Sequence, residues 1–140
     1  RRLAVVAVAT AAVLALASCT DPEPLVDPDS PVASYSWSRS DGGLDALVSG
    51  YLLLLADCLV ISSTADAATA GSIVVPVFSR SYGSWDVETQ RLTYDPITYD
   101  LGAYVEFAGG FVDYDTLSNL DLPDACARFA DGDGIFLVQE

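Results

Sequence analysis

Histidine is absent from this chain of 140 residues. Its absence excludes Ser-His-Asp and Cys-His catalysis, and it removes the commonest metal ligand and proton shuttle of proteins. Any reaction would have to depend on carboxylates and tyrosines. We therefore expect a protein that is not an enzyme and that holds no cofactor.

Basic residues are scarce: six arginines and no lysine stand against 20 acidic residues, for a net charge of −14. Nucleic-acid binding requires Lys and Arg side chains that neutralise phosphates, and a surface this acidic repels them. The composition excludes nucleic acid as a partner. Solubility is a sufficient explanation of the charge itself.

Long apolar runs are limited to one, the 15 residues 3–17 that follow Arg1 and Arg2. The run is shorter than the ~20 residues of a permanent membrane-spanning helix, so this pattern is typical of an export leader. Small residues and a cysteine follow at once. The sequence therefore predicts a signal peptide over residues 1–18.

The leader ends in Leu16-Ala17-Ser18-Cys19, which resembles the lipobox of bacterial lipoproteins. The resemblance implies that Cys19 carries a diacylglyceryl group and becomes the mature N-terminus. The protein would then be anchored to the extracytoplasmic face of the cell membrane, where two acyl chains hold stably. The alternative is an ordinary signal peptide cut near Ala17, with Cys19 as a free thiol or a disulfide partner.

Residues 19–43 contain four prolines and scattered acids, a composition that predicts an extended linker rather than a core. Trp37 lies in this stretch and could pack back onto the domain. From residue 44 the chain becomes apolar, and we expect one folded domain over residues 44–140.

Short apolar and β-branched runs separated by turn residues predict strands. We expect a tight turn near Ala56-Asp57, a strand around Pro76 at an edge or bulge, and a bulge or bend at Gly109-Gly110. Between residues 101 and 107 apolar side chains alternate with polar or small ones, as in a half-buried strand. The expected fold is all-β with little helix: a five- to seven-stranded barrel, OB-like by preference, or a sandwich.

Cysteine is rare, with three in the chain. If Cys19 carries lipid, Cys58 and Cys126 remain as an even pair in an oxidising compartment and predict one disulfide. The alternative is two buried free thiols. A zinc site is not expected, because two thiolates without histidine lack the usual ligand set.

Several short segments occur in an order that resembles small secreted lipoproteins of actinobacteria whose function is uncharacterised: Gly50-x-Leu52, Asp57-Cys58-Leu59, Val75-Pro76-Val77, Trp85, Ala108-Gly109-Gly110 and Leu122-Pro123-x-x-Cys126. The resemblance covers roughly residues 50–138. It implies a disulfide-linked β domain and contributes no catalytic residue.

Three pairs of acids have the spacing that places both side chains on one face of a strand: Asp86/Glu88, Asp113/Asp115 and Asp131/Asp133. Such pairs could bind a cation or act as an acid–base couple. Solvated turns are the simpler explanation in a chain this acidic. Asp131 and Asp133 are a weak candidate for calcium, because Phe129 would occupy the first ligand position of an EF-hand loop.

Aromatic residues among these acids are the other candidate surface: Trp85, Tyr94, Tyr99, Tyr104 and Tyr114. Aromatic rings beside carboxylates suit sugars, although Tyr and Trp are also ordinary strand residues. We expect a membrane-anchored, non-catalytic module that binds a cell-envelope glycan or protein or serves in envelope assembly. A carbohydrate- or cation-binding module and a carboxylate-based hydrolase are the alternatives.

Overall fold

The computed structural model describes residues 29–131 and 134–140. The expected leader and Cys19 lie outside these residues. The described part forms ten strands and four short 3₁₀ helices: β1 (Ala33–Tyr35), η1 (Arg39–Asp41), β2 (Ala46–Leu55), β3 (Cys58–Ser62), η2 (Ala67–Thr69), β4 (Ile73–Ser79), β5 (Gly83–Asp86), β6 (Arg91–Tyr94), β7 (Ile97–Asp100), β8 (Tyr104–Val112), η3 (Tyr114–Thr116), β9 (Leu120–Asp121), η4 (Asp124–Phe129) and β10 (Ile135–Val138).

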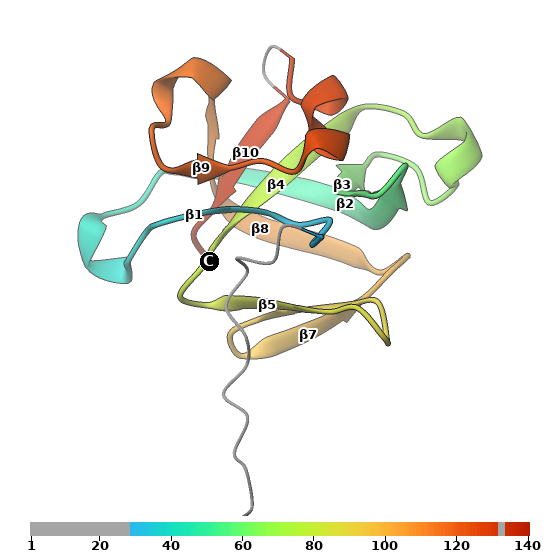
Figure 1. Cartoon of the computed structure of the whole chain (residues 1–140), viewed down its shortest axis with the longest axis horizontal. Helices are drawn as coiled ribbons and strands as arrows, with labels where there is room; N and C mark the ends of the chain where they lie inside the picture. The colour runs from blue at the N-terminus through green and yellow to red at the C-terminus, as the bar shows by residue number, and fades with distance from the viewer. Residues whose placement is uncertain (1–28, 132–133) are drawn as a thin grey trace, which may run out of the picture.

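Five of the strands close into a barrel (Figure 1). The ring runs β2–β3–β4–β10–β8 and returns to β2, and the pairing of β10 with β4 is parallel. If the five barrel strands are numbered 1 to 5 along the chain, their order around the ring is 1-2-3-5-4, and strands 3 and 5 are parallel. That order is the topology of an OB-like barrel, so the expected fold class is confirmed and the sandwich is not.

The first two barrel strands form a hairpin at the expected turn. Ala56 and Asp57 have φ values of 46° and 63°, the two positive values of a type I′ turn. Leu55 pairs with Cys58 directly beside this turn. At the other end of the hairpin, a Cβ on Gly50 would lie 2.5 Å from the carbonyl oxygen of Ser62, so glycine allows the two backbones to approach closely.

The barrel interior is filled by alternate residues of its strands. On β8, Val105 and Phe107 are buried while Tyr104 and Glu106 are exposed, which confirms the predicted alternation over these four residues. The strand begins later than the pattern suggested. Residues 101–102 form a turn instead, with Gly102 at φ 83°.

A separate three-stranded sheet, β5–β6–β7, packs against the barrel and covers one end of its core (Figure 1). Leu92 and Tyr94 of β6 are buried in the same cluster as the barrel interior. The Tyr94 ring lies edge-on to Phe78, with centroids 5.2 Å apart, and to Phe107 at 6.4 Å. Short strands in this region were predicted, but not their position beneath the barrel.

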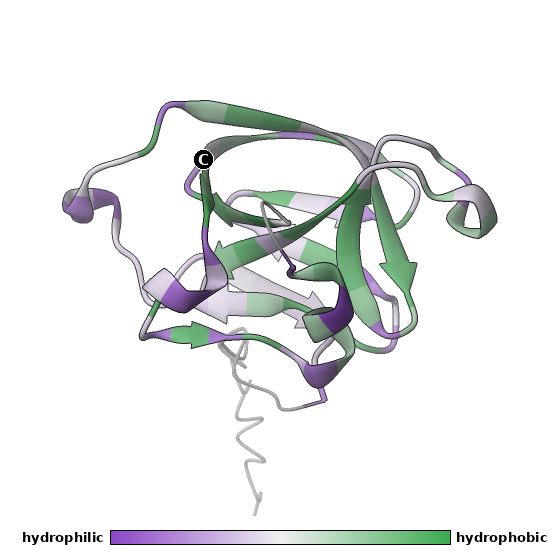
Figure 2. Ribbon diagram, turned by 90° about the horizontal axis from the view of Figure 1, so that it is seen from above, coloured by the Kyte–Doolittle hydropathy of each residue, from purple (hydrophilic) through white to green (hydrophobic). Residues whose placement is uncertain are grey.

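A second apolar cluster lies on the outer face of β3 and β4. The segments β1, β9 and η4 cover this face, and all five residues of β3 are consequently buried. Figure 2 shows apolar residues concentrated along the barrel strands and polar residues in the loops and short helices. Both faces of β3, the one toward the barrel interior and the outer one, therefore pack against apolar residues.

The domain begins earlier than the sequence indicated. β1 lies inside the expected linker, yet it pairs with β4 in parallel and with β9 in antiparallel, and Val32, Ala33 and Tyr35 are buried. The Leu59 amide donates to the carbonyl of Pro31 at 2.9 Å. The boundary at residue 44 is therefore wrong, because the proline- and serine-rich composition concealed three apolar residues that fill a gap between β3 and β4.

Of the two expected positions for Pro76, an edge or a bulge, the edge is wrong. β4 has neighbours on both sides, and the Val75 amide donates to Gly134 on the β10 side at 2.7 Å. The Pro76 nitrogen therefore faces the other side. There, pairing with β3 has ended at Val74 and pairing with β1 starts at Val77, so no ladder bond is lost.

Candidate functional site

The five aromatic residues predicted as a glycan surface lie in different surroundings. Tyr94 is only 4% exposed and its hydroxyl donates to the Val138 carbonyl at 3.2 Å, so it cannot stack on a ligand. Trp85 and Tyr99 pack partly against the barrel core. Tyr104 is exposed on the outside of β8, and Tyr114 lies on η3. Trp85, Tyr94 and Tyr99 thus pack in or against the barrel core, and Tyr104 and Tyr114 are exposed.

Asp86 of the Asp86/Glu88 pair stabilises a turn. One carboxylate oxygen of Asp86 accepts from the Glu88 and Thr89 amides at 2.9 and 3.1 Å. These hydrogen bonds, those from Thr89 foremost, lower the pKa of Asp86. The carboxylate is thereby committed to the β5–β6 connection rather than to a ligand.

Residues of the other two predicted acid pairs line the same cavity. Asp113, Asp115 and Asp131 line one cavity of about 540 Å³, together with Tyr114. Asp133 lies outside the described residues. Within residues 29–131 and 134–140, no three His, Cys, Asp or Glu side chains are grouped so that they could hold a metal ion. This cavity therefore gives no specific support to the calcium hypothesis.

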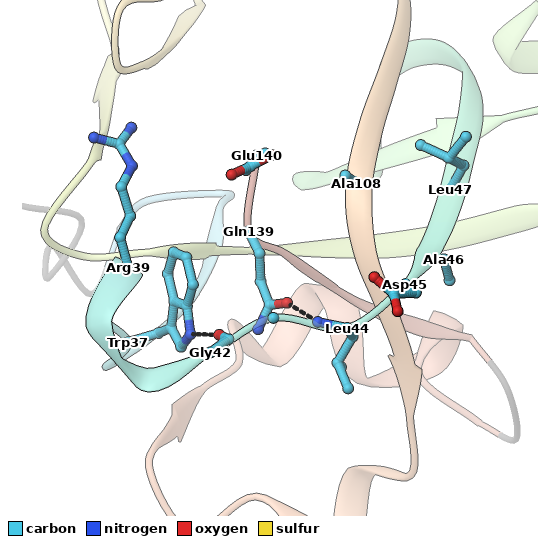
Figure 3. A pocket seen from close by; sticks show the side chains of 11 residues that line it. Trp37, Arg39, Gly42, Leu44, Asp45, Ala46, Leu47, Ala108, Gln139 and Glu140 are labelled. Atoms are coloured by element: carbon cyan, nitrogen blue, oxygen red, sulfur yellow. Dashed lines mark hydrogen bonds between the residues drawn. The ribbon is translucent and has the colours of Figure 1, made fainter.

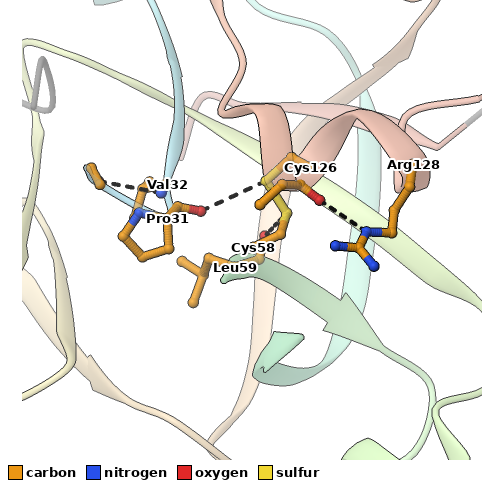
Figure 4. Close-up of a disulfide and its surroundings, with 8 residues drawn as sticks. Pro31, Val32, Cys58, Leu59, Cys126 and Arg128 are labelled. Carbon is orange, nitrogen blue, oxygen red and sulfur yellow. Dashed lines mark hydrogen bonds between the residues drawn. A yellow bond between two sulfur atoms is a disulfide. The ribbon is translucent and has the colours of Figure 1, made fainter. Parts of the chain in front are cut away.

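The predicted disulfide joins Cys58 of β3 to Cys126 of η4 (Figure 4). Both residues are fully buried. The Cys126 sulfur lies 3.7 Å from the Pro31 carbonyl oxygen, and since an oxidised sulfur carries no proton this is a packing contact. Ligands of OB-like barrels commonly bind on the second and third strands. Here the bridge fixes η4 over that face and closes it.

A cavity of about 460 Å³ lies where the loop before β2 meets the end of β10 (Figure 3). It is lined by apolar, amide and charged groups, including Trp37, Arg39, Leu44, Asp45, Leu47, Ala108, Gln139 and Glu140. These residues come from residues 37–47, from β8 and from the end of the described chain. We call it the Trp37 cavity.

Local sequence explains how the wall of this cavity forms. Ser38 and Asp41 cap the short helix η1, and the Ser38 amide donates to the Asp41 carboxylate at 2.8 Å. Gly42 then takes a φ of 85°, which turns the chain back. The Trp37 indole N–H donates to the Gly42 carbonyl at 3.0 Å and so holds the ring against this turn (Figure 3).

Gln139 fixes the other wall. Its side chain is buried, and its Oε1 accepts from the Leu44 amide at 2.6 Å (Figure 3). A second hydrogen bond joins Gln139 to Tyr35, whose hydroxyl donates to the Val138 carbonyl at 3.2 Å. Burial nevertheless raises the pKa of Tyr35 to about 12, so its hydroxyl stays protonated. Hydrogen bonds therefore hold this wall of the cavity in place.

The charged groups around the cavity differ in whether they have an interaction partner. The Arg39 guanidinium lies 4.4 Å from the centroid of the Tyr82 ring and 3.8 Å from the Asp95 carboxylate. Asp45 and Glu140 are exposed, and within the described part of the chain neither carboxylate has an ion-pair partner. The cavity thus offers apolar surface and two available negative charges.

Sequence reasoning missed this site. It placed Trp37 in the linker, although it allowed for packing onto the domain, and the ring does contact Tyr82 at a centroid distance of 6.1 Å. The capping pair Ser38/Asp41 followed by Gly42-Gly43 was a signal of ordered structure there. The pairing of this loop with residues 139–140 had no local signal.

The described residues contain no helix with the length and hydropathy of a membrane span. The chain has no significant match to a family model, a curated protein or a solved structure.

Proposed function

We propose that this chain is a lipid-anchored lipoprotein of the extracytoplasmic face of the cell membrane, and that its barrel binds a cell-envelope partner without catalysis. The observation that carries the proposal is the Cys58–Cys126 disulfide. It uses two of the three cysteines in the chain and leaves Cys19, in the lipobox-like Leu16-Ala17-Ser18-Cys19, for acylation.

The disulfide supports an external location because such bonds form and persist in oxidising compartments. A diacylglyceryl group on Cys19 would supply the two acyl chains that stable membrane anchoring requires. Ten positions separate Cys19 from Asp29, the first described residue, so the barrel would be held close to the membrane surface.

A binding role is supported by the Trp37 cavity. Its lining combines apolar side chains, a fixed amide, two carboxylates and the Arg39 guanidinium, a mixture suited to recognition. Carbohydrate binding through the predicted aromatic set is less favoured, because Tyr94 is buried and Trp85 and Tyr99 pack against the barrel core. Of the predicted carboxylate pairs, Asp86 is engaged by backbone amides of its own turn, which speaks against an acid–base role for Asp86/Glu88.

Intact-mass analysis of the protein purified from a lipoprotein-processing bacterium tests the anchor. We expect a chain that starts at Cys19, carries a diacylglyceryl adduct and fractionates with membranes. The Cys19→Ser variant should lose both the adduct and membrane retention while the 58–126 disulfide still forms. An unmodified Cys19, or Cys58 and Cys126 open to alkylation in the native protein, would contradict the proposal.

A further inference from the structure

We infer that the Trp37 cavity binds a lysine or arginine side chain presented on an apolar segment of a partner protein. This inference rests on the proposed binding function and adds the chemical class of the partner. Three features of the cavity carry it: exposed leucines, two available carboxylates and a preformed wall.

The apolar part of the lining is exposed to solvent. Leu44 is 45% exposed and Leu47 is 66% exposed, and both are large side chains that a folded domain usually buries. Leu47 lies on the outer face of β2, opposite Ala108 of β8. A small amine in the cavity would leave this surface uncovered, whereas a peptide segment would cover it.

The charge of the cavity selects a cation. Asp45 and Glu140 contribute two negative charges to the lining and Arg39 one positive charge, and the Arg39 guanidinium lies beside the Tyr82 ring and the Asp95 carboxylate. The net charge of −14 adds a long-range attraction for basic partners and a repulsion of acidic ones. Carboxylate or phosphate ligands are therefore disfavoured.

Lysine and arginine match both features at once. Their aliphatic stems pack on apolar surface while the charged end stays near water and carboxylates. The half-buried ring of Trp37 adds apolar surface to the lining. Since the hydrogen bonds Trp37–Gly42 and Gln139–Leu44 already fix the walls, little ordering cost remains for the protein on binding.

Tripeptides titrated into the full chain, purified from cells in mild detergent, provide the test. The probes are acetyl-Leu-Arg-Leu-amide and its neutral counterpart acetyl-Leu-Gln-Leu-amide. The chain has two tryptophans, so the Trp85→Phe background leaves the fluorescence of Trp37 as the reporter. We expect a saturable change with the arginine peptide that weakens as salt is raised, and a clearly smaller affinity for the glutamine peptide.

The carboxylates are tested by the Asp45→Asn/Glu140→Gln double variant. Because it removes two exposed ion pairs, this variant should bind the arginine peptide about fivefold more weakly. The matched control is Asp113→Asn/Asp115→Asn, which removes the same charge from the cavity lined by Asp113, Asp115 and Asp131 and should leave the affinity within about twofold. Near-UV circular dichroism confirms that both variants keep the fold.

Three results would overturn the inference: equal affinity for both peptides, an equal loss in the control variant, or no saturable change for the arginine peptide up to about 10 mM, the limit of weak recognition. Binding of free arginine amide as tightly as the peptide would replace the protein partner by a small cation. None of these outcomes depends on Cys19, so they are separable from a failure of the proposed membrane anchor.

Discussion

Removal of the Cys58–Cys126 bridge is the most direct perturbation of this fold. The cysteines are separated by 68 residues, and the chain-entropy model gives about 4 kcal/mol for a closed loop of this length. A domain of this size has a total stability of roughly 5–15 kcal/mol. The Cys58→Ala/Cys126→Ala variant should therefore lose a large share of its stability while it keeps its β circular dichroism.

Urea unfolding of the oxidised protein and the variant measures this loss. Each single variant, Cys58→Ala or Cys126→Ala, also lacks the bridge and should agree with the double variant to within about 1 kcal/mol. Because both sulfurs are fully buried, dithiothreitol should reduce the native protein far more slowly than the protein in urea. A double variant within about 1 kcal/mol of the oxidised protein would refute the reasoning.

Two further predictions concern buried positions of the domain. Burial raises the pKa of Tyr35 to about 12 and also that of Tyr94. The unfolded chain therefore loses these protons first, so stability should fall above about pH 10 by up to about 1.4 kcal/mol per pH unit for each tyrosine. Urea unfolding between pH 8 and 11 (~0.5-unit steps) should show this slope reduced in Tyr35→Phe, and an unchanged slope would contradict the assignment. A Cβ on Gly109 would lie 1.8 Å from the Leu137 carbonyl oxygen. Gly109→Ala should thus cost about 1–3 kcal/mol or more in thermal unfolding, while Gly43→Ala stays near neutral; equal effects would argue against this close approach.

Local patterns in the sequence were sufficient for the fold class. The turn at Ala56-Asp57 and the alternation through Val105 and Phe107 are properties of neighbouring residues, and both were found where they were predicted. The disulfide followed from counting cysteines once Cys19 had been set aside. Each of these inferences needed only chain order, spacing and residue type.

Several features were decided by the tertiary structure. β1 pairs with β4 across 44 positions, as Ala33 faces Val77, and this pairing turns part of the expected linker into sheet. The same insertion explains how Pro76 is tolerated in a strand with neighbours on both sides. No local pattern indicates that a gap exists between β3 and β4.

The candidate site likewise depends partly on composition and partly on the tertiary structure. From composition alone, the sequence determined that the surface is acidic and that histidine chemistry is absent. Only the folded chain decided that Tyr94 is buried and that Trp37, Asp45 and Glu140 surround one cavity. The physical reason is that spacing along the chain specifies which residues share a strand face. The closure of the barrel specifies which distant segments meet.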